Sequence, residues 1–395
     1  MTLFGYGKTT SAIAKKFGNC KIYDDNFDSV EKFNSNELLP MAEFNPEAST
    51  LEIPSPGIVP THPTIKSAKN LISEYDLFAK DMPYSIWISG TNGKTTTTAM
   101  IQHLLEKYQA VSGGNIGTPL ADLDPEAKIW ILETSSFTLH YTNIAKPNLY
   151  ILLPISEDHI EWHGSFEAYE AAKLKPLSML VEGEIALVPS KYINVPTSGS
   201  LIAYDDSSTL AKEFSIDMSR VNFIEPFLTD ALLALAVSKI LFNEVDYDLL
   251  NTFIVGSHKL ESFKDSEDRT WIDDSKATNI DATIAALKSF KEEKLYLILG
   301  GDDKGANMQV LFDTLQEYDV ELFLIGKNYQ KLSSLAIQHN IVFVECGLLD
   351  IAVSKIAQKH TKNSVALLSP AAASLDQFSS YKERGEKFKE YVAKT

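Results

Sequence analysis

A glycine- and lysine-containing loop between an apolar strand and a helical segment constrains this chain more than any other feature. Residues 85–89 read Ser-Ile-Trp-Ile-Ser, and Gly90-Thr91-Asn92-Gly93-Lys94-Thr95-Thr96 follows directly. Glycines let a backbone approach an anion, the first N–H groups of a helix face that anion, and a lysine adds positive charge. The unit therefore predicts a parallel α/β fold with a nucleotide phosphate site. Ile88 stands where the usual Walker loop begins with glycine, so the loop is a shortened variant; a purely structural turn is the alternative.

Short apolar runs alternate with helical periodicity along all 395 residues, which favours parallel sheets covered by helices. The length suggests two or three domains, and breaks are expected in the polar segment 74–83 and near residues 255–257. We therefore expect three α/β domains: a Rossmann-like domain over 1–81, a central P-loop-type ATPase domain over 82–255 and a Rossmann-like domain over 256–395. Residues 228–242 have the pattern of a buried helix, and Ser374 with Gln377 suggests a capping box for the last helix.

Composition limits the partners and the compartment. The net charge of −17 repels nucleic acid and anionic membranes, so anionic ligands need local lysines, helix ends or metal ions. Two distant cysteines, Cys20 and Cys346, form neither a disulfide framework nor a zinc motif, which favours a reducing compartment. The N-terminus has no signal-peptide pattern, and no apolar run reaches the length of about 20 residues of a membrane span. We expect a cytoplasmic monomer that binds small molecules, with no nucleic-acid or membrane partner.

Polar residues follow two further predicted strands near the phosphate loop. Glu133 ends the apolar run 129–132, and a carboxylate at that position suits Mg²⁺. Asp158 and His159 follow the run 149–154, at the strand ends where α/β proteins bind ligands. Taken alone, such a glutamate is more often a solvated strand end, and such a histidine is usually structural.

Three other loops carry weaker signals. Gly5-Tyr6-Gly7, with acids about 20 residues later, resembles a dinucleotide fingerprint that lacks its third glycine, so a tight turn is nearly as good an interpretation. The segment 113–119 is a loop by composition, and its glycines suggest close approach to a ligand. Lysine-containing loops at 274–279 and 300–305 suit a small substrate with carboxylates, although solvated loops are the simpler explanation.

In order along nearly the whole chain, these motifs resemble the Mur ligase family. The loop 90–96 is similar to its ATP loop, 114–117 to its substrate loop and Glu133-Thr134-Ser135-Ser136-Phe137 to its magnesium-binding segment. Asp158-His159 is similar to the pair whose histidine serves a second metal site, and 171–175 to the segment with a carbamylated lysine, here Lys173. The resemblance implies ATP, two Mg²⁺ sites and a carbamate on Lys173. It assigns catalytic roles to Lys94, His159 and Lys173, and metal contacts to Thr95, Glu133, His159 and Lys173.

The C-terminal third resembles the branch of the family that adds D-glutamate. The resemblance implies an ATP-dependent ligase that joins D-glutamate to UDP-N-acetylmuramoyl-L-alanine through an acyl phosphate, in peptidoglycan precursor synthesis. The implied D-glutamate contacts are Thr278, Lys304, Ser374, Leu375 and Tyr381. The implied contacts to the UDP substrate are Thr9, Asp24, Asp25, Gly57 and Asn115. The implied ATP contacts are Gly90, Thr91, Asn92, Gly93, Lys94, Thr95, Thr96, Lys259 and Asp274.

The chain departs from the family pattern at two places. The family has a His-Asn-x-x-Asn segment near adenine, where this chain has Phe227 and Asp230, and an arginine where this chain has Lys259. A lysine cannot reproduce the two-pronged contact of a guanidinium, so altered ATP contacts are expected. The alternatives to a D-glutamate ligase are another Mur ligase, which would carry different C-terminal loops, and a folyl-polyglutamate ligase, which would lack the N-terminal unit. A nucleotide switch without ligase chemistry and, more weakly, a dinucleotide oxidoreductase are further alternatives.

Overall fold

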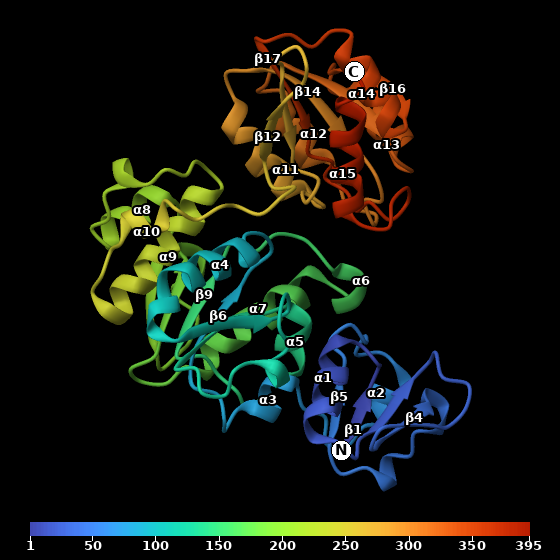
Figure 1. The fold of residues 1–395 in the computed structure, drawn as a ribbon, viewed down its shortest axis with the longest axis vertical. Helices are drawn as coiled ribbons and strands as arrows, with labels where there is room; N and C mark the ends of the chain where they lie inside the picture. Colours follow the sequence, from blue (N-terminus) through green and yellow to red (C-terminus); the bar gives the residue numbers. More distant parts are fainter. The chain divides into compact units, whose positions relative to one another are not determined.

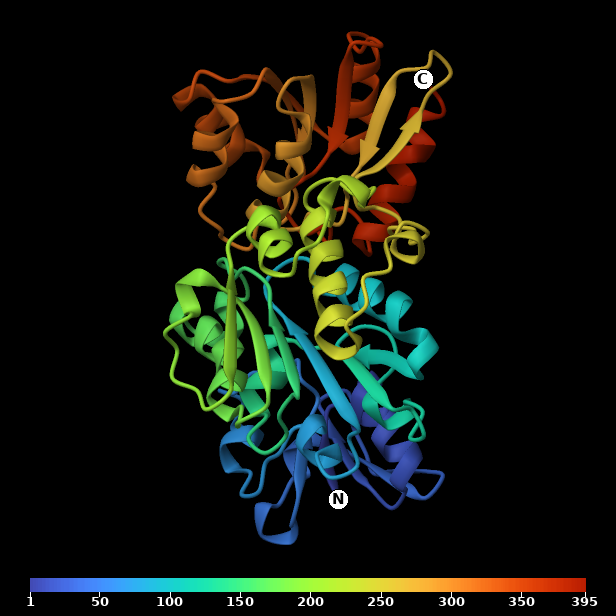
Figure 2. The same ribbon diagram turned by 90° about the vertical axis from the view of Figure 1, so that its left-hand side faces the viewer.

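The computed structural model describes all residues from 1 to 395 (Figure 1). The chain divides into two compact units: Met1–Asn222 with Phe227–Phe253, and Phe223–Pro226 with Ile254–Thr395. The first unit holds two sheets and the second holds one, and helices cover all three sheets (Figures 1 and 2). The predicted α/β class with three mostly parallel sheets is confirmed. The domain boundaries at 81 and 255 stay predictions, although each sheet lies within one predicted range.

The N-terminal sheet has the strand order β3-β4-β2-β1-β5, and only β3 is antiparallel to its neighbour. Its strands are β1 (Thr2–Phe4), β2 (Lys21–Asp24), β3 (Glu31–Phe33), β4 (Asn36–Pro40) and β5 (Glu52–Pro54). The helices of this region are α1 (Lys8–Phe17), α2 (Pro63–Ser67) and α3 (Glu74–Phe78). Leu3, Ile22 and Ile53 from three neighbouring strands are buried in one apolar cluster, which explains why these short strands pair.

The central sheet is wholly parallel, in the order β11-β10-β9-β6-β8-β7. Its strands are β6 (Tyr84–Ser89), β7 (Ala110–Gly114), β8 (Ile129–Glu133), β9 (Leu149–Leu152), β10 (Ile185–Pro189) and β11 (Ser200–Tyr204). The helices are α4 (Lys94–Leu105), α5 (Ser136–Tyr141), α6 (Ile160–His163), α7 (Phe166–Met179), α8 (Ser207–Glu213), α9 (Phe227–Phe242) and α10 (Tyr247–Leu250). Residues 230–238 of α9 are all buried, as the apolar run predicts, and α9 packs on α4.

The C-terminal sheet has the order β12-β13-β17-β14-β15-β16, with only β12 antiparallel. Its strands are β12 (Glu261–Lys264), β13 (Thr270–Asp273), β14 (Lys294–Leu299), β15 (Val320–Ile325), β16 (Val342–Gly347) and β17 (Ser364–Leu368). The helices are α11 (Ile280–Leu287), α12 (Gln309–Leu315), α13 (Tyr329–Gln338), α14 (Leu349–Ala357) and α15 (Tyr381–Val392). Alternate residues of β14 enter two different apolar clusters, one on each face of the sheet.

Two local predictions are wrong. The last helix begins after Ser380, whose side chain accepts the Glu383 N–H, so the capping box at Ser374 and Gln377 does not form there. The polar segment 74–83 begins as helix α3 and Glu74 is buried, and the domain boundary expected in this segment stays a prediction. Two glycines of the expected loop 113–119 belong to β7 instead.

The buried acids of α3 have backbone partners that the sequence does not reveal. Glu74 accepts the Leu120 N–H at 3.0 Å, and Asp76 accepts the N–H groups of three consecutive residues, 143–145. Burial raises the pKa of Glu74 to about 8, and the backbone hydrogen bonds oppose that rise. Polar residues thus fasten this segment into the first unit. No helix of the protein has the length and apolar character needed to cross a membrane.

Candidate active site

Four neighbouring strands of the central sheet end at one edge and lead into most of the predicted ATP and metal residues. In the order β9-β6-β8-β7, these strands lead into residues 153–159, the phosphate loop, Glu133 and Asn115 respectively. Because the strands are parallel, their carboxyl ends meet at this edge, where α/β sheets bind ligands. Four motifs that lie far apart in the sequence therefore reach one place.

The phosphate loop is held in a conformation that only glycine adopts without strain at two positions. Gly90 has φ 138°, and a Cβ there would come within 2.4 Å of the Leu153 side chain. Gly93 has φ 85° and caps α4. The Lys94 ammonium donates to the carbonyls of Gly90 at 2.9 Å and Thr91 at 2.7 Å, so its charge lies over the loop. The first turn of α4 begins directly at Lys94, and the N-terminus of a helix suits a bound phosphate.

Side chains from outside the loop fix its position. Thr91 donates its N–H to the Pro154 carbonyl at 3.0 Å and shares a hydrogen bond with the Tyr169 hydroxyl at 2.9 Å. Asp230, in the first turn of α9, accepts the Thr97 hydroxyl at 2.7 Å and lies beside Gly93. The aspartate that replaces an expected asparagine is thus buried against the phosphate loop and ties α9 to α4. Sequence reasoning did not predict this contact.

Glu133 and Asn115, to which the resemblance assigns different ligands, contact one another. Glu133 is buried at the end of β8, and its carboxylate accepts the Asn115 side-chain amide at 2.9 Å. The Asn115 backbone N–H also bonds to the Glu133 carbonyl at 2.8 Å. A Cβ at Gly114, which has φ 97°, would come within 2.5 Å of that carbonyl. The glycine therefore permits the close approach of β7 to β8 at this edge, and the ligand contact expected of this loop stays a prediction.

His159, the predicted ligand of the second metal site, lies at a left-handed turn. His159 has φ 53° and precedes the single-turn helix α6, and its backbone N–H donates to the Asp158 carboxylate at 2.8 Å. Its imidazole contacts the rings of Phe137 at 4.8 Å and Tyr169 at 6.2 Å between centroids. These two aromatic side chains hold the imidazole at the same strand edge as the phosphate loop.

Lys173 is buried beneath the phosphate loop. Its ammonium donates to the Gly90 carbonyl at 2.7 Å and lies 4.7 Å from the centre of the Tyr169 ring. Burial, followed by the charge of Lys94, holds the pKa of Lys173 well below its usual range, against the opposing effect of Asp158 and Glu133. A lysine with a lowered pKa has a larger neutral fraction, which is the nucleophilic form. This environment differs sharply from that of an ordinary surface lysine.

Two residues of α6 that the sequence analysis did not select also belong to this edge. His163 shares a hydrogen bond with the Ser136 hydroxyl at 3.0 Å through Nε2, while its buried Nδ1 has no hydrogen-bond partner. Burial, and then the charges of His140, His159 and Lys173, lower the pKa of His163 to about 4. Trp162 stacks on Phe137 at 4.5 Å. The spacing of His159 and His163, one helical turn apart, was the signal that could have identified His163.

In the N-terminal sheet, β2, β1 and β5 are neighbours, so four of the five predicted UDP contacts lie at one edge, whereas Asn115 follows β7 of the central sheet. Asp24 accepts the Tyr6 N–H at 2.6 Å and also two N–H groups of Asn26, so its carboxylate shapes the glycine turn. Asp25 lies 3.6 Å from His62, and Thr9 is the second residue of α1. The Gly57 carbonyl accepts the Trp162 indole N–H at 3.1 Å, which links this edge to α6.

The predicted D-glutamate contacts also converge, because β13, β17 and β14 are adjacent and parallel. The loops after these strands carry Thr278, Ser374 with Leu375, and Lys304 respectively. Ser374 is buried, whereas Lys304 is exposed and Leu375 is 70% exposed. Tyr381 begins α15, and its ring lies 4.4 Å from the Lys276 ammonium.

Below this edge lies a buried polar network. Asp274 accepts the Ser369 hydroxyl at 2.7 Å, and burial raises its pKa to about 7. Arg384 is fully buried and donates to the Ser275 hydroxyl and carbonyl and to the Ala372 carbonyl. Arg384 thus ties together the loops after β13 and β17; sequence reasoning missed it because a lone arginine in a helix carries no motif. The predicted ATP contacts Lys259 and Asp274 both belong to the second unit, and their role stays a prediction.

One group of residues has the spacing of a metal site but was not predicted. Atoms of His258, Glu261 and Asp273 lie within 4.8 Å of one another. The Lys389 ammonium bonds to Glu261 at 2.6 Å and lies 3.7 Å from Asp273, and His258 bonds to Asp273 at 2.6 Å. The lysine already neutralises these carboxylates, so the group is a structural ion-pair cluster.

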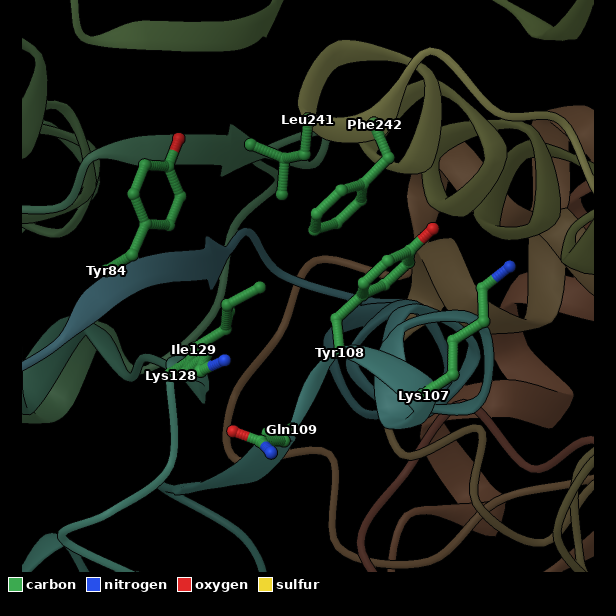
Figure 3. A pocket seen from close by; sticks show the side chains of 8 residues that line it. All are labelled: Tyr84, Lys107, Tyr108, Gln109, Lys128, Ile129, Leu241 and Phe242. Carbon is green, nitrogen blue, oxygen red and sulfur yellow. The ribbon is translucent and has the colours of Figure 1, made fainter.

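A surface pocket of about 510 Å³ lies at the opposite end of the central sheet (Figure 3). Tyr84 and Ile129, which line it, begin β6 and β8, and Tyr108 stacks on Phe242 at 3.6 Å in its wall. None of the predicted site residues lines this pocket. It is therefore separate from the candidate active site.

Comparison with known proteins is consistent with this geometry. A family model described as the Mur ligase middle domain matches residues 88–195. The chain is 52% identical over 399 residues to the UDP-N-acetylmuramoylalanine--D-glutamate ligase of Campylobacter jejuni (strain RM1221), with 100% of this chain and 99% of that protein covered. It is 45% identical over 419 residues to the protein of the same name from Helicobacter pylori (strain HPAG1), with the same coverage. The MurF ligase of Thermotoga maritima in complex with ADP covers 100% of this chain and 97% of its own, with TM-score 0.61 and 16% identity, which shows a shared fold.

The fold and the loop define a three-sheet α/β protein with a nucleotide phosphate site at the edge of its central sheet. The full-length identity to named relatives makes the assignment specific: the chain belongs to the Mur ligase family, in the group of the UDP-N-acetylmuramoylalanine--D-glutamate ligases.

Proposed function

We propose that the protein uses ATP to join D-glutamate to UDP-N-acetylmuramoyl-L-alanine in cytoplasmic peptidoglycan precursor synthesis. The observation that carries this proposal is the 52% identity, over the whole chain, to a ligase of that name. The three strand edges support it, because each gathers residues that are predicted to contact one substrate. The other Mur ligases and the nucleotide switch are disfavoured, since the full-length relatives bear one ligase name.

The reaction needs the alanyl carboxylate to become a better electrophile. The carboxylate attacks the γ-phosphorus of ATP, which gives an acyl phosphate and ADP; the neutral amine of D-glutamate then attacks the acyl carbon, and phosphate leaves. Lys94 would place its charge beside the transferred phosphoryl group, where stabilisation of developing charge lowers the barrier. The loop glycines and the start of α4 would orient the phosphates through backbone N–H groups.

The residues at the central edge fit a role in holding Mg²⁺. Glu133 offers a buried carboxylate and Thr95 a hydroxyl, which are the hard oxygen ligands that Mg²⁺ prefers, and His159 lies at the same edge. When bound, Mg²⁺ would supply charge neutralisation at the phosphate oxygens. Asn115 would orient the Glu133 carboxylate through their 2.9 Å hydrogen bond.

We also propose that Lys173 carries a carbamate. Its buried amine and lowered pKa support this modification, because CO₂ reacts with the neutral form of an amine. The nitrogen–carbon bond forms as one proton leaves the neutral nitrogen, and the amine becomes a carbamate with anionic oxygen ligands. The second metal site would then use this carbamate with His159.

The acceptor is tested by competition. The protein, ATP, Mg²⁺ and UDP-N-acetylmuramoyl-L-alanine are incubated with equal concentrations of D-glutamate, L-glutamate, L-lysine, meso-diaminopimelate and L-alanine, and the products are separated by mass. We expect the D-glutamyl product alone, with chirality confirmed by hydrolysis and chiral chromatography. A different single product would keep the ligase chemistry and overturn the assignment of the C-terminal loops.

A further inference from the structure

The single-turn helix α6 joins two predicted sites of the first unit. It begins after His159, with φ 53°, and ends at Gly164, with φ 86°, so left-handed residues bound it on both sides. The N–H groups of Trp162 and His163 both donate to the His159 carbonyl at 3.1 Å. A displacement of Trp162 therefore acts directly on the turn that carries His159.

The Trp162 side chain reaches the loop that follows β5. Its indole N–H donates to the Gly57 carbonyl at 3.1 Å, and the next carbonyl, that of Ile58, accepts the Tyr141 hydroxyl at 2.8 Å. Trp162 and Tyr141 also pack with the apolar cluster around Phe4 of the N-terminal sheet. Two consecutive carbonyls of the predicted UDP loop are thus held by side chains that belong to the central sheet's layers.

A second route links the same two sites. The ring of Phe137 lies 4.5 Å from that of Trp162, at an interplanar angle of 29°, and 4.8 Å from the imidazole of His159. Phe137 is adjacent to Ser136, which bonds to His163. The indole, the phenyl ring and the imidazole form a continuous packed row from Gly57 to His159, alongside the backbone turn.

We propose that Trp162 is a positioning residue that couples occupation of the Gly57 loop by the uridine diphosphate part of the substrate to the placement of His159. The inference rests on the proposed function, because that function supplies the two ligands. Binding at the Gly57 loop sets the position of its carbonyl, the indole follows that carbonyl, and α6 carries the change to the metal and phosphate edge. UDP and Mg²⁺–ATP then strengthen one another's binding, reciprocally.

Tryptophan emission gives a direct readout, because the chain has four tryptophans and three of them are buried. These three are Trp87, Trp130 and Trp271, with exposures of 0%, 3% and 0%. UDP alone, titrated into the full-length protein, is expected to change the emission of Trp162. Trp162→Phe keeps an aromatic ring on Phe137 but removes the indole fluorophore together with its N–H, so loss of the change in this variant assigns the signal to Trp162.

The coupling is measured as the ratio of the Kd values of Mg²⁺–ATP without and with saturating UDP-N-acetylmuramoyl-L-alanine, determined by calorimetry with a non-hydrolysable ATP analogue. The wild type should show a ratio of about 5 or more, which is the lower end of typical coupling between sites. Trp162→Phe should bring the ratio to about 1. Tyr141→Phe is the matched control. It removes the hydrogen bond to the neighbouring Ile58 carbonyl, and it should weaken binding of the UDP substrate while leaving the ratio of Kd values unchanged.

Each outcome decides between a positioning and a merely structural role. If Trp162→Phe binds the UDP substrate less tightly but keeps the wild-type ratio, Trp162 only packs and the inference is overturned. A wild-type ratio of 1 in an enzyme that forms product overturns the inference and leaves the proposed function intact. A wild type that neither binds UDP nor forms product overturns both. Near-ultraviolet circular dichroism confirms that the variants are folded.

Discussion

The carboxyl edges of the central and C-terminal sheets are both formed by parallel strands followed by polar loops, but their side chains differ in hydrogen bonding and exposure. At the central edge, Lys94, Lys173 and Glu133 each hold a hydrogen bond within the protein. At the C-terminal edge, Lys304 and Leu375 are exposed side chains on loops. The difference suggests that the groups proposed for phosphate chemistry are preorganised, whereas the proposed acceptor contacts depend on the ligand to order them. Preorganised charge contributes mainly to the chemical step, and ligand-ordered contacts mainly to substrate affinity.

The largest effect should come from Lys94→Ala, because it removes the charge over the phosphate loop. We expect kcat to fall about 10³-fold or more, as for the loss of one preorganised charge at a developing anion. Phosphate release under saturating substrates measures it. Lys107→Ala, an exposed lysine paired with Glu244 beyond the end of the same helix, should stay near wild type. Near-wild-type turnover by Lys94→Ala would contradict the assignment of the loop.

Lys173→Ala should lower kcat about 10²-fold or more, since a buried group at the same edge is lost. Added bicarbonate should not restore its activity. In the wild type, ¹³C-bicarbonate should give a carbamate resonance by nuclear magnetic resonance, and this signal should be absent from the variant. Lys175→Ala is the matched control, because that lysine lies on the same helix and bonds to Asn143 instead. A carbamate signal that survives in Lys173→Ala would place the modification elsewhere.

Lys304→Ala should affect affinity rather than the chemical step. The loss of one charged contact to a carboxylate should raise the KM for D-glutamate about 10-fold or more, with little change in the KM for ATP. Initial rates with each substrate varied in turn give both values. Lys291→Ala, which removes a surface lysine paired with Glu317, serves as the comparison. Equal effects on both KM values would remove Lys304 from the acceptor site and weaken the contrast between the two edges.

The smallest effect is a pH dependence of stability from Asp274. Its pKa is raised to about 7 in the folded protein from 3.8, so the folded state holds a proton that the unfolded state releases. Stability from this group is complete below pH 3.8 and is lost as the pH rises through 7. Relative to the wild type, Asp274→Asn should therefore become more stable by a few kcal/mol at most between pH 5 and 8. Urea unfolding at several pH values measures it; a pH-independent difference would contradict the assigned pKa.

Sequence patterns predicted the strands and their polar ends because buried parallel strands are apolar runs that stop where ligands bind. The phosphate loop, Glu133 and the loop around Lys304 were predicted in this way. The contact of Asn115 with Glu133 was not, because it depends on β7 lying beside β8. The burial of Glu74 was not predicted, since the backbone N–H that its carboxylate accepts comes from Leu120.

The region around α6 escaped prediction for a different reason. A helix of four residues between two left-handed residues has no periodic pattern, and Trp162 carries no motif. Its partner, the Gly57 carbonyl, is a backbone atom 105 residues away. Such a contact follows from the packing of two sheets in one unit, which local sequence does not encode.

Phosphate release from ATP with UDP-N-acetylmuramoyl-L-alanine, measured with each amino acid in turn, tests the central claim most directly. The account predicts release with D-glutamate and only background release with L-glutamate, L-lysine, meso-diaminopimelate or L-alanine. Release that does not depend on any acceptor, or that another amino acid supports better than D-glutamate, would contradict it.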